Sequence, residues 1–127
     1  MSLIVKAAAF VTARQWRRWD DLTKNPWKTQ ERLLLDVIQC NRATCFGRDH
    51  HFEAIRNLND YRKHVEIGDY ERLRAYVERA QNGEAGELTE EPVLMFTVTS
   101  GSTGAPKLIP VTEASKTNHR ELTRLWY

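Results

Sequence analysis

The chain has 127 residues, of which 41% are hydrophobic and 28% are charged, and its 19 basic and 17 acidic side chains give a formal net charge of +2. This length fits one small domain, and the composition does not support a disordered or a membrane-embedded chain. A net charge this small does not point to nucleic acid as a partner.

The first predicted element is a helix over residues 3–22, where apolar side chains recur at helical spacing. Its apolar start is too short to span a bilayer and no signal-peptide cleavage pattern follows it, so we expect a cytoplasmic protein without a membrane partner. Trp16 and Trp19 enclose two arginines, a pattern that can contact nucleic acid or a membrane surface. We favour the alternative in which the tryptophans pack inward and the arginines face solvent.

A second helix is predicted to begin at Asn25 and Pro26, because proline is well tolerated in the first turn of a helix. One face of this helix runs from Trp27 through Ile38 to Asn41 at helical spacing. Residues 41–52 are mostly polar and contain a glycine, which predicts a structured loop between helices.

Two cysteines and two histidines near this loop raise the question of a zinc site. They are Cys40, Cys45, His50 and His51. Structural zinc sites usually space their paired ligands two to four residues apart, whereas these histidines are adjacent. We therefore predict no metal site, and we expect reduced thiols.

The next segment, residues 61–67, leans towards β structure through Val65 and Ile67. Asp69 then offers an N-cap for a helix over residues 70–81, and Gly83 lies just past the expected end of that helix. Residues 82–91 form an acidic, glycine-containing linker.

Residues 93–99 give the clearest strand prediction in the chain, because they favour β structure and are apolar on both faces, as in a buried strand. A second strand is predicted over residues 108–112. The predicted fold class is α+β, with three parts: a mainly helical region over residues 1–91, a strand, loop and strand over residues 92–112, and a truncated helix over residues 113–127.

The loop between the strands, residues 99–107, reads Thr-Ser-Gly-Ser-Thr-Gly-Ala-Pro-Lys. Its glycines allow close backbone approach, and successive amides in such a turn can surround an anion. Lys107 adds a positive charge, so a phosphate is one candidate guest, and an unliganded Ser/Gly-rich loop is the other. A Walker A loop is excluded because Pro106 stands where that motif needs glycine, and the dinucleotide fingerprint is absent.

This nine-residue segment resembles the phosphate loop of the adenylate-forming superfamily, which includes firefly luciferase and acyl-CoA synthetases. The upstream sequence is similar to the N-terminal region of the auxin-responsive promoter (GH-three) family of acyl-acid amido synthetases. The residues that carry this second similarity are Asn41, Thr44 to Arg48, His50, Phe52, Tyr61, Arg62, Ile67, Asp69 to Glu71, Gly86, Leu88, Thr89 and Pro92.

The resemblance implies an enzyme that uses ATP and magnesium to adenylate a small carboxylic acid and then transfers the acyl group to an amine or amino acid. It implies cofactor-binding roles for Thr99, Ser100, Gly101, Ser102, Thr103, Gly104 and Lys107. It identifies neither a catalytic residue nor a protein ligand for a metal. Residues 104–106 follow the general superfamily form, and His51 stands where glycine is common, so no plant substrate preference is carried over.

Family members are several times longer than this chain, so we expect an N-terminal piece of an adenylation domain that is inactive by itself. The alternative is a truncated, non-catalytic helical module for protein contacts. Because the strand over residues 93–99 is apolar on both faces, we also expect the chain to self-associate.

Overall fold

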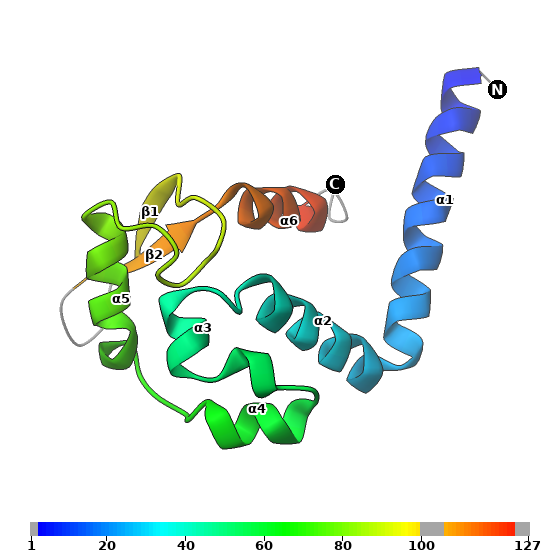
Figure 1. The fold of residues 1–127 in the computed structure, drawn as a ribbon. Helices are drawn as coiled ribbons and strands as arrows, with labels where there is room; N and C mark the ends of the chain where they lie inside the picture. The colour runs from blue at the N-terminus through cyan, green and yellow to red at the C-terminus, as the bar shows by residue number, and fades with distance from the viewer. Residues whose placement is uncertain (1–2, 100–105, 124–127) are drawn as a thin grey trace.

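The computed structural model describes residues 3–99 and 106–123, and Figure 1 shows their arrangement. The elements are α1 (Leu3–Lys24), α2 (Pro26–Cys40), α3 (Cys45–Asp49), the 3-10 helix η1 (Phe52–Ala54), α4 (Leu58–His64), α5 (Glu71–Gln81), β1 (Met95–Thr99), β2 (Lys107–Val111) and α6 (Glu113–Thr123). The α+β class predicted from the sequence is confirmed.

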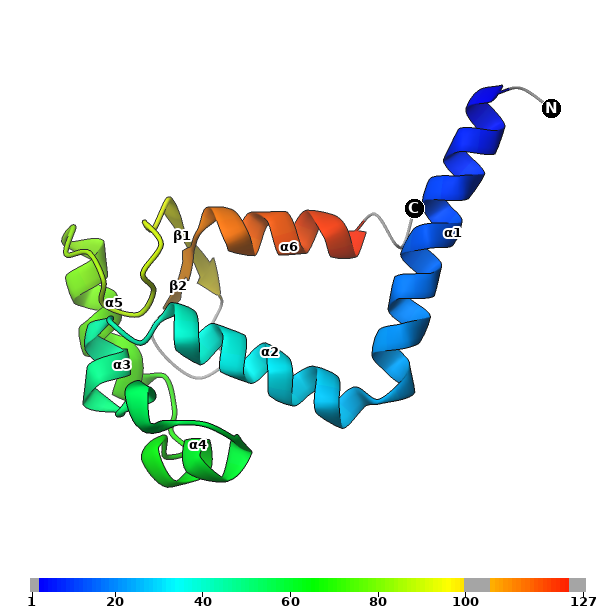
Figure 2. The same cartoon turned by 45° about the vertical axis from the view of Figure 1, so that its right-hand side comes forward.

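Helix α1 projects away from the rest of the molecule and meets α2 at a sharp elbow, as both ribbon views show (Figures 1 and 2). The elbow forms because the Asn25 side chain accepts a hydrogen bond from the Lys28 amide and Pro26 starts α2. The expectation that the two tryptophans pack inward is wrong, because Trp16 is 59% and Trp19 39% exposed. An isolated helix has no partner surface against which to bury them.

The predicted loop over residues 41–52 contains the short helix α3 and leads into η1. Thr44, which is fully buried, begins α3 by accepting a hydrogen bond from the Gly47 amide at 2.9 Å and donating one to the Asn41 carbonyl at 2.8 Å. A Cβ atom on Gly47 would lie 2.2 Å from that same carbonyl oxygen, so the turn leaves no room for a side chain. Sequence periodicity could not detect a helix of five residues.

The β-leaning prediction for residues 61–67 is wrong, because α4 occupies the first part of this range. Asn57 caps α4 by accepting hydrogen bonds from the amides of Asn59 and Asp60. Val65 follows the helix in an extended conformation, and Ile67 is fully exposed, so neither residue pairs with another strand. A local cap therefore makes residues 61–64 helical, and the two β-branched residues that follow belong to no strand.

A small hydrophobic core lies where α2, η1 and α4 meet. Ile38, Phe52 and Ile55 are its buried members, and the partly buried side chains packed around them are Leu34, Leu35, Phe46, Tyr61 and Val65. Val77 of α5 is buried separately, with an exposure of 2%.

The end of the chain folds as a hairpin followed by a helix. Helix α5 ends as predicted, with Gly83 in the left-handed region at a φ of 94°. Strands β1 and β2 pair antiparallel, and α6 then runs alongside α2 towards α1 (Figures 1 and 2). The prediction that residues 93–99 form a buried strand is wrong for this chain, because Leu94, Met95 and Val98 are each at least half exposed.

Candidate phosphate-binding hairpin

The structure brings together the two ends of the predicted phosphate loop. Thr99 closes β1, Lys107 opens β2, and these two residues face each other as the last pair of the ladder. The Thr99 hydroxyl lies 3.5 Å from the Lys107 carbonyl oxygen, and both residues are exposed. The five other predicted cofactor-binding residues lie outside the described residues. They are Ser100, Gly101, Ser102, Thr103 and Gly104.

Tyr70, which directly precedes α5, joins the hairpin to the helical part of the chain. Its hydroxyl oxygen accepts a hydrogen bond from the Leu108 amide at 3.0 Å and lies 3.3 Å from the Leu108 carbonyl oxygen, to which it donates. Leu108 immediately follows the lysine that ends the predicted loop. Sequence reasoning placed Tyr70 at the start of the helix over residues 70–81 and in the family resemblance, and it predicted no contact with the hairpin.

Two cations lie over the Tyr70 ring. The ammonium nitrogen of Lys107 is 5.8 Å from the ring centroid, and the guanidinium carbon of Arg74 is 5.4 Å from it. Arg74 also pairs with the Glu71 carboxylate through contacts of 2.6 and 2.7 Å. The hydrogen bonds from Arg74, with a smaller contribution from Lys107, lower the pKa of Glu71 below its ordinary value of 4.5. At the Tyr70 ring, Arg74 is thus neutralised by Glu71, and the Lys107 ammonium adds a positive charge that favours an anionic ligand.

The side of the hairpin that leads into α6 is held by local caps. Thr112 and Ser115 cap each other, with the Ser115 hydroxyl accepting from the Thr112 amide at 2.9 Å and the Thr112 hydroxyl accepting from the Ser115 amide at 3.3 Å. The Glu91 carboxylate accepts from the Ala114 amide at 3.2 Å. The predicted acidic linker therefore contributes directly to the start of α6.

The same linker also returns to α3 and forms a structure that we call the clasp, made of Cys45 and Phe46 on one side and Gly86 and Glu87 on the other. The Cys45 amide donates to the Gly86 carbonyl at 2.7 Å, and the Phe46 amide donates to the Glu87 carbonyl at 3.0 Å. These bonds satisfy two of the free amides at the start of α3. Sequence patterns do not predict that these two distant segments meet.

A buried ion pair lies beneath the clasp. The Glu87 side chain is 4% exposed and contacts the Arg79 guanidinium at 2.6 and 2.9 Å. Hydrogen bonding from Arg79, against the opposing effect of burial, lowers the pKa of Glu87. The same carboxylate raises the pKa of the Cys45 thiol by hydrogen bonding, which disfavours the reactive thiolate. This cluster is therefore suited to holding the fold together and not to nucleophilic chemistry.

Tyr76 extends this cluster along α5. Its hydroxyl donates to the Asp49 carboxylate at 2.6 Å, and its ring lies 4.8 Å from the Arg79 guanidinium carbon. The hydrogen bond and partial burial raise the pKa of Tyr76 to about 12. Helix α5 thus presents two tyrosines whose hydroxyls have different tasks, since Tyr70 binds the hairpin and Tyr76 binds α3.

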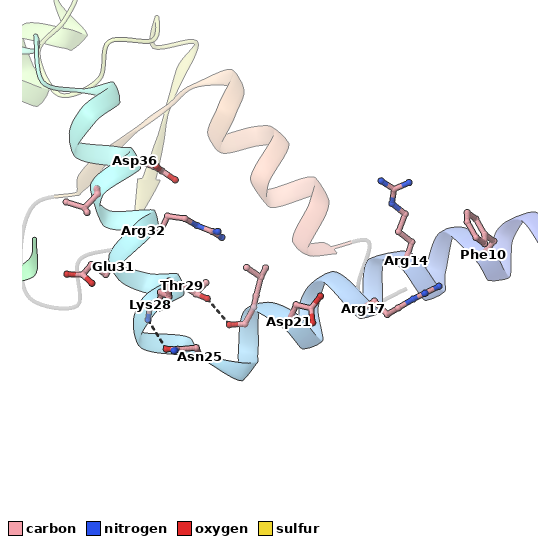
Figure 3. Close-up of a pocket in the computed structure, with 12 residues that line it drawn as sticks. Phe10, Arg14, Arg17, Asp21, Asn25, Lys28, Thr29, Glu31, Arg32 and Asp36 are labelled. Carbon is pink, nitrogen blue, oxygen red and sulfur yellow. Dashed lines mark hydrogen bonds between the residues drawn. The ribbon is translucent and has the colours of Figure 1, made fainter. Parts of the chain in front are cut away.

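A wide groove lies in the elbow between α1 and α2, shown in close-up in Figure 3. It has a volume of about 1030 Å³. Arg14, Arg17 and Arg32 line it together with Asp21 and Asp36, so both signs of charge are present. This mixture does not single out an anionic or a cationic ligand, and neither Thr99 nor Lys107, the two predicted cofactor-binding residues that the structure describes, lines the groove.

The structure gives other contacts to the residues considered for zinc. Among the residues that the structure describes, no group of three or more histidine, cysteine, aspartate or glutamate side chains could hold a metal ion. His50 directs its Nδ1 atom to the His64 carbonyl oxygen at 3.2 Å.

Over the residues that the structure describes, none of the helices combines the length and apolar character needed to cross a bilayer.

Comparison with known proteins places these features in a family. The model of the GH3 family N-terminal domain matches residues 15–127. Indole-3-acetic acid-amido synthetase GH3.15 of Arabidopsis thaliana is 33% identical over 95 residues, which cover 73% of this chain and 16% of that protein. Indole-3-acetic acid-amido synthetase GH3.8 of Oryza sativa subsp. indica is 30% identical over 93 residues, covering 72% of this chain and 15% of that protein.

The fold has a similar counterpart among solved structures. The acyl acid amido synthetase GH3.15 of Arabidopsis thaliana, in complex with 2,4-DB, matches with a TM-score of 0.80 and 27% sequence identity. The match covers 91% of this chain and 20% of that chain. The chain thus spans between 15% and 20% of the length of these two relatives.

Proposed function

Because the chain belongs to the GH3 family, we propose that it is the N-terminal part of an ATP-dependent acyl acid amido synthetase. The relatives compared above are named as amido synthetases, which supports ligase chemistry of this kind. A small carboxylic acid, ATP and an amine or amino acid would be the three substrates.

The reaction proposed has two steps. A carboxylate oxygen attacks the α-phosphorus of ATP, which forms an acyl adenylate and releases pyrophosphate. The amine nitrogen then attacks the acyl carbon, the carbon-oxygen bond to AMP breaks, and the amine loses a proton as the amide forms. The first step brings anions together, so its rate depends on fixed positive charge and hydrogen-bond donors around the phosphates.

The observation that carries this proposal is the hairpin that ends in Thr99 and Lys107. The pairing of β1 with β2 sets the two ends of the candidate phosphate loop opposite each other, with a lysine at the exit. We assign phosphate contacts to this lysine, to Thr99 and to residues 100–104. Magnesium would enter this site together with the ATP phosphates, because Mg²⁺ in such enzymes is usually held by substrate phosphates and few protein ligands.

The remaining binding sites of such an enzyme are not assigned to this chain. A chain that spans less than a quarter of the length of its relatives holds few of the contacts that adenosine, the acyl acid and the amine require. We therefore propose that these 127 residues alone do not adenylate acids. The acid itself is left to experiment, with indole-3-acetic acid as the first candidate because the relatives are named for it.

The proposal is tested by ATP-pyrophosphate exchange. The natural protein that carries this sequence is assayed with a panel of carboxylic acids, first as wild type and then as Lys107→Ala. Loss of one charge at the phosphates should slow exchange by roughly 100-fold. Lys116→Ala is the control, because Lys116 is a lysine of α6 already paired with Glu113 at 3.0 Å. The proposal would be contradicted if none of the acids supported exchange, or if Lys107→Ala and Lys116→Ala exchanged at the same rate.

A further inference from the structure

The contact between Tyr70 and Leu108 is unusual because one side-chain hydroxyl satisfies both backbone groups of one residue. It accepts from the amide at 3.0 Å and donates to the carbonyl at 3.3 Å. Within the ladder Leu108 is paired with Val98. In an antiparallel ladder, alternate residues point both backbone groups away from the partner strand, and these groups form an open edge. Tyr70 therefore occupies the position of a third strand at this one residue.

The same tyrosine also restrains the residue before Leu108. The Lys107 ammonium lies 5.8 Å from the ring centroid, and Arg74 lies over the ring at 5.4 Å. Arg74 is in turn fixed by its two contacts with Glu71. The lysine backbone is held through its neighbour and the lysine side chain through the ring, so a single residue limits both kinds of motion.

We propose that Tyr70 is a positioning residue for the polyphosphate of a nucleoside triphosphate, acting through Lys107 and the first residues of β2. The inference rests on the function proposed above, and it adds a residue outside the loop to the phosphate site. Holding the lysine before the ligand arrives lowers the entropy lost on binding, an effect that corresponds to roughly twofold to tenfold in affinity.

The probe is tripolyphosphate, titrated into the isotopically labelled 127-residue chain and followed by NMR. Tyr70→Phe removes both hydrogen bonds to Leu108 and keeps the ring. Tyr76→Phe is the matched control, because Tyr76 is also held through its hydroxyl, to Asp49 at 2.6 Å, but contacts α3 and not the hairpin. Each variant loses one hydroxyl from the same region of the chain, so a general loss of stability should appear in both.

We expect Tyr70→Phe to bind tripolyphosphate roughly twofold to tenfold more weakly, and Tyr76→Phe to bind it as the wild type does. The Leu108 amide should also exchange its hydrogen roughly tenfold faster in Tyr70→Phe only. Equal affinities in Tyr70→Phe and the wild type would overturn the inference while leaving the proposed phosphate site in place. A wild-type chain that binds no tripolyphosphate would remove that site, and this inference with it.

A measurement on the wild type needs no folded variant. The ε-methylene protons of Lys107 should be shifted upfield by the Tyr70 ring current, and tripolyphosphate should change that shift. Lysine ε-methylene protons at their ordinary position would show that the ring does not restrain Lys107, and would overturn the inference independently of any substitution.

Discussion

The buried pair between Arg79 and Glu87 should make Arg79→Ala one of the more damaging changes in α5. Removing one partner of a buried ion pair costs about 3–5 kcal/mol, because the other charge is left without compensation. The Arg79 side chain is 39% exposed, so water can partly replace it at the 4% exposed Glu87. We therefore expect a loss of about 2 kcal/mol, equivalent to a fall in Tm of roughly 6–10 °C for a chain of this size.

The chain offers a close control in Arg74→Ala. Arg74 lies on the same helix, meets Glu71 at the same distance of 2.6 Å as Arg79 meets Glu87, and likewise lies over a tyrosine ring. The difference is burial, because the Glu71 side chain is 62% exposed. An exposed pair contributes about 0–1 kcal/mol. Any excess loss in Arg79→Ala can then be assigned to the burial of its carboxylate.

Both variants are measured by urea and thermal unfolding followed by circular dichroism. We expect the Arg79→Ala midpoint to lie well below that of Arg74→Ala, with similar slopes against urea. Equal losses in the two variants would refute the reasoning, since they would mean that burial adds nothing to the energy of this pair. A double variant, Arg79→Leu with Glu87→Leu, should recover part of the loss, because no unpaired charge remains.

Further predictions concern pH, packing and association. Glu87 has a folded-state pKa below its unfolded value of 4.5, so its contribution to stability is present above pH 4.5 and is lost as pH falls through the folded value. Between pH 7 and pH 3, the Tm of the wild type should therefore fall more steeply than the Tm of Glu87→Gln. Gly47→Ala should lower the free energy of unfolding by about 2 kcal/mol, because its Cβ meets a backbone oxygen at 2.2 Å, and unchanged urea unfolding would show that the turn can relax. Met95 is 53% exposed on β1, so we predict that the chain self-associates through the hairpin. Met95→Lys should then reduce the apparent mass in light scattering, and a wild type that stays monomeric at high concentration would count against this prediction.

The long elements were predictable because each carries a repeated local signal. The break at Asn25 and Pro26 follows from capping chemistry, and α5 ends two residues before Gly83, which adopts a positive φ. The β-leaning prediction for residues 61–67 failed because a cap at Asn57 starts a helix that takes residues 61–64, and no strand includes Val65 or Ile67. A strong signal at one position is easily missed when propensity is summed over a window.

The candidate site was predictable only in part. The composition of residues 99–107 predicted a loop between strands, and the described ends of that loop agree. Tyr70 could not be found by the same reasoning, since its partner Leu108 lies 38 positions away in sequence. The exposure of β1 was not predicted, because an apolar sequence indicates that a strand can be buried but does not show whether another part of the fold covers it.

The clasp between residues 45–46 and 86–87 has a consequence for how the molecule opens. It joins segments about 40 residues apart, so forming it during folding costs loop-closure entropy, whereas the hydrogen bonds within each helix join residues close in sequence. Once closed, it should tie α3, α4 and α5 into one cooperative unit, whereas among the described residues the main contacts of α1 are with α2. Native-state hydrogen exchange should therefore find the amides of Cys45 and Phe46 opening only with the whole of this unit, while the amides of α1 exchange by local fraying at far lower free energy.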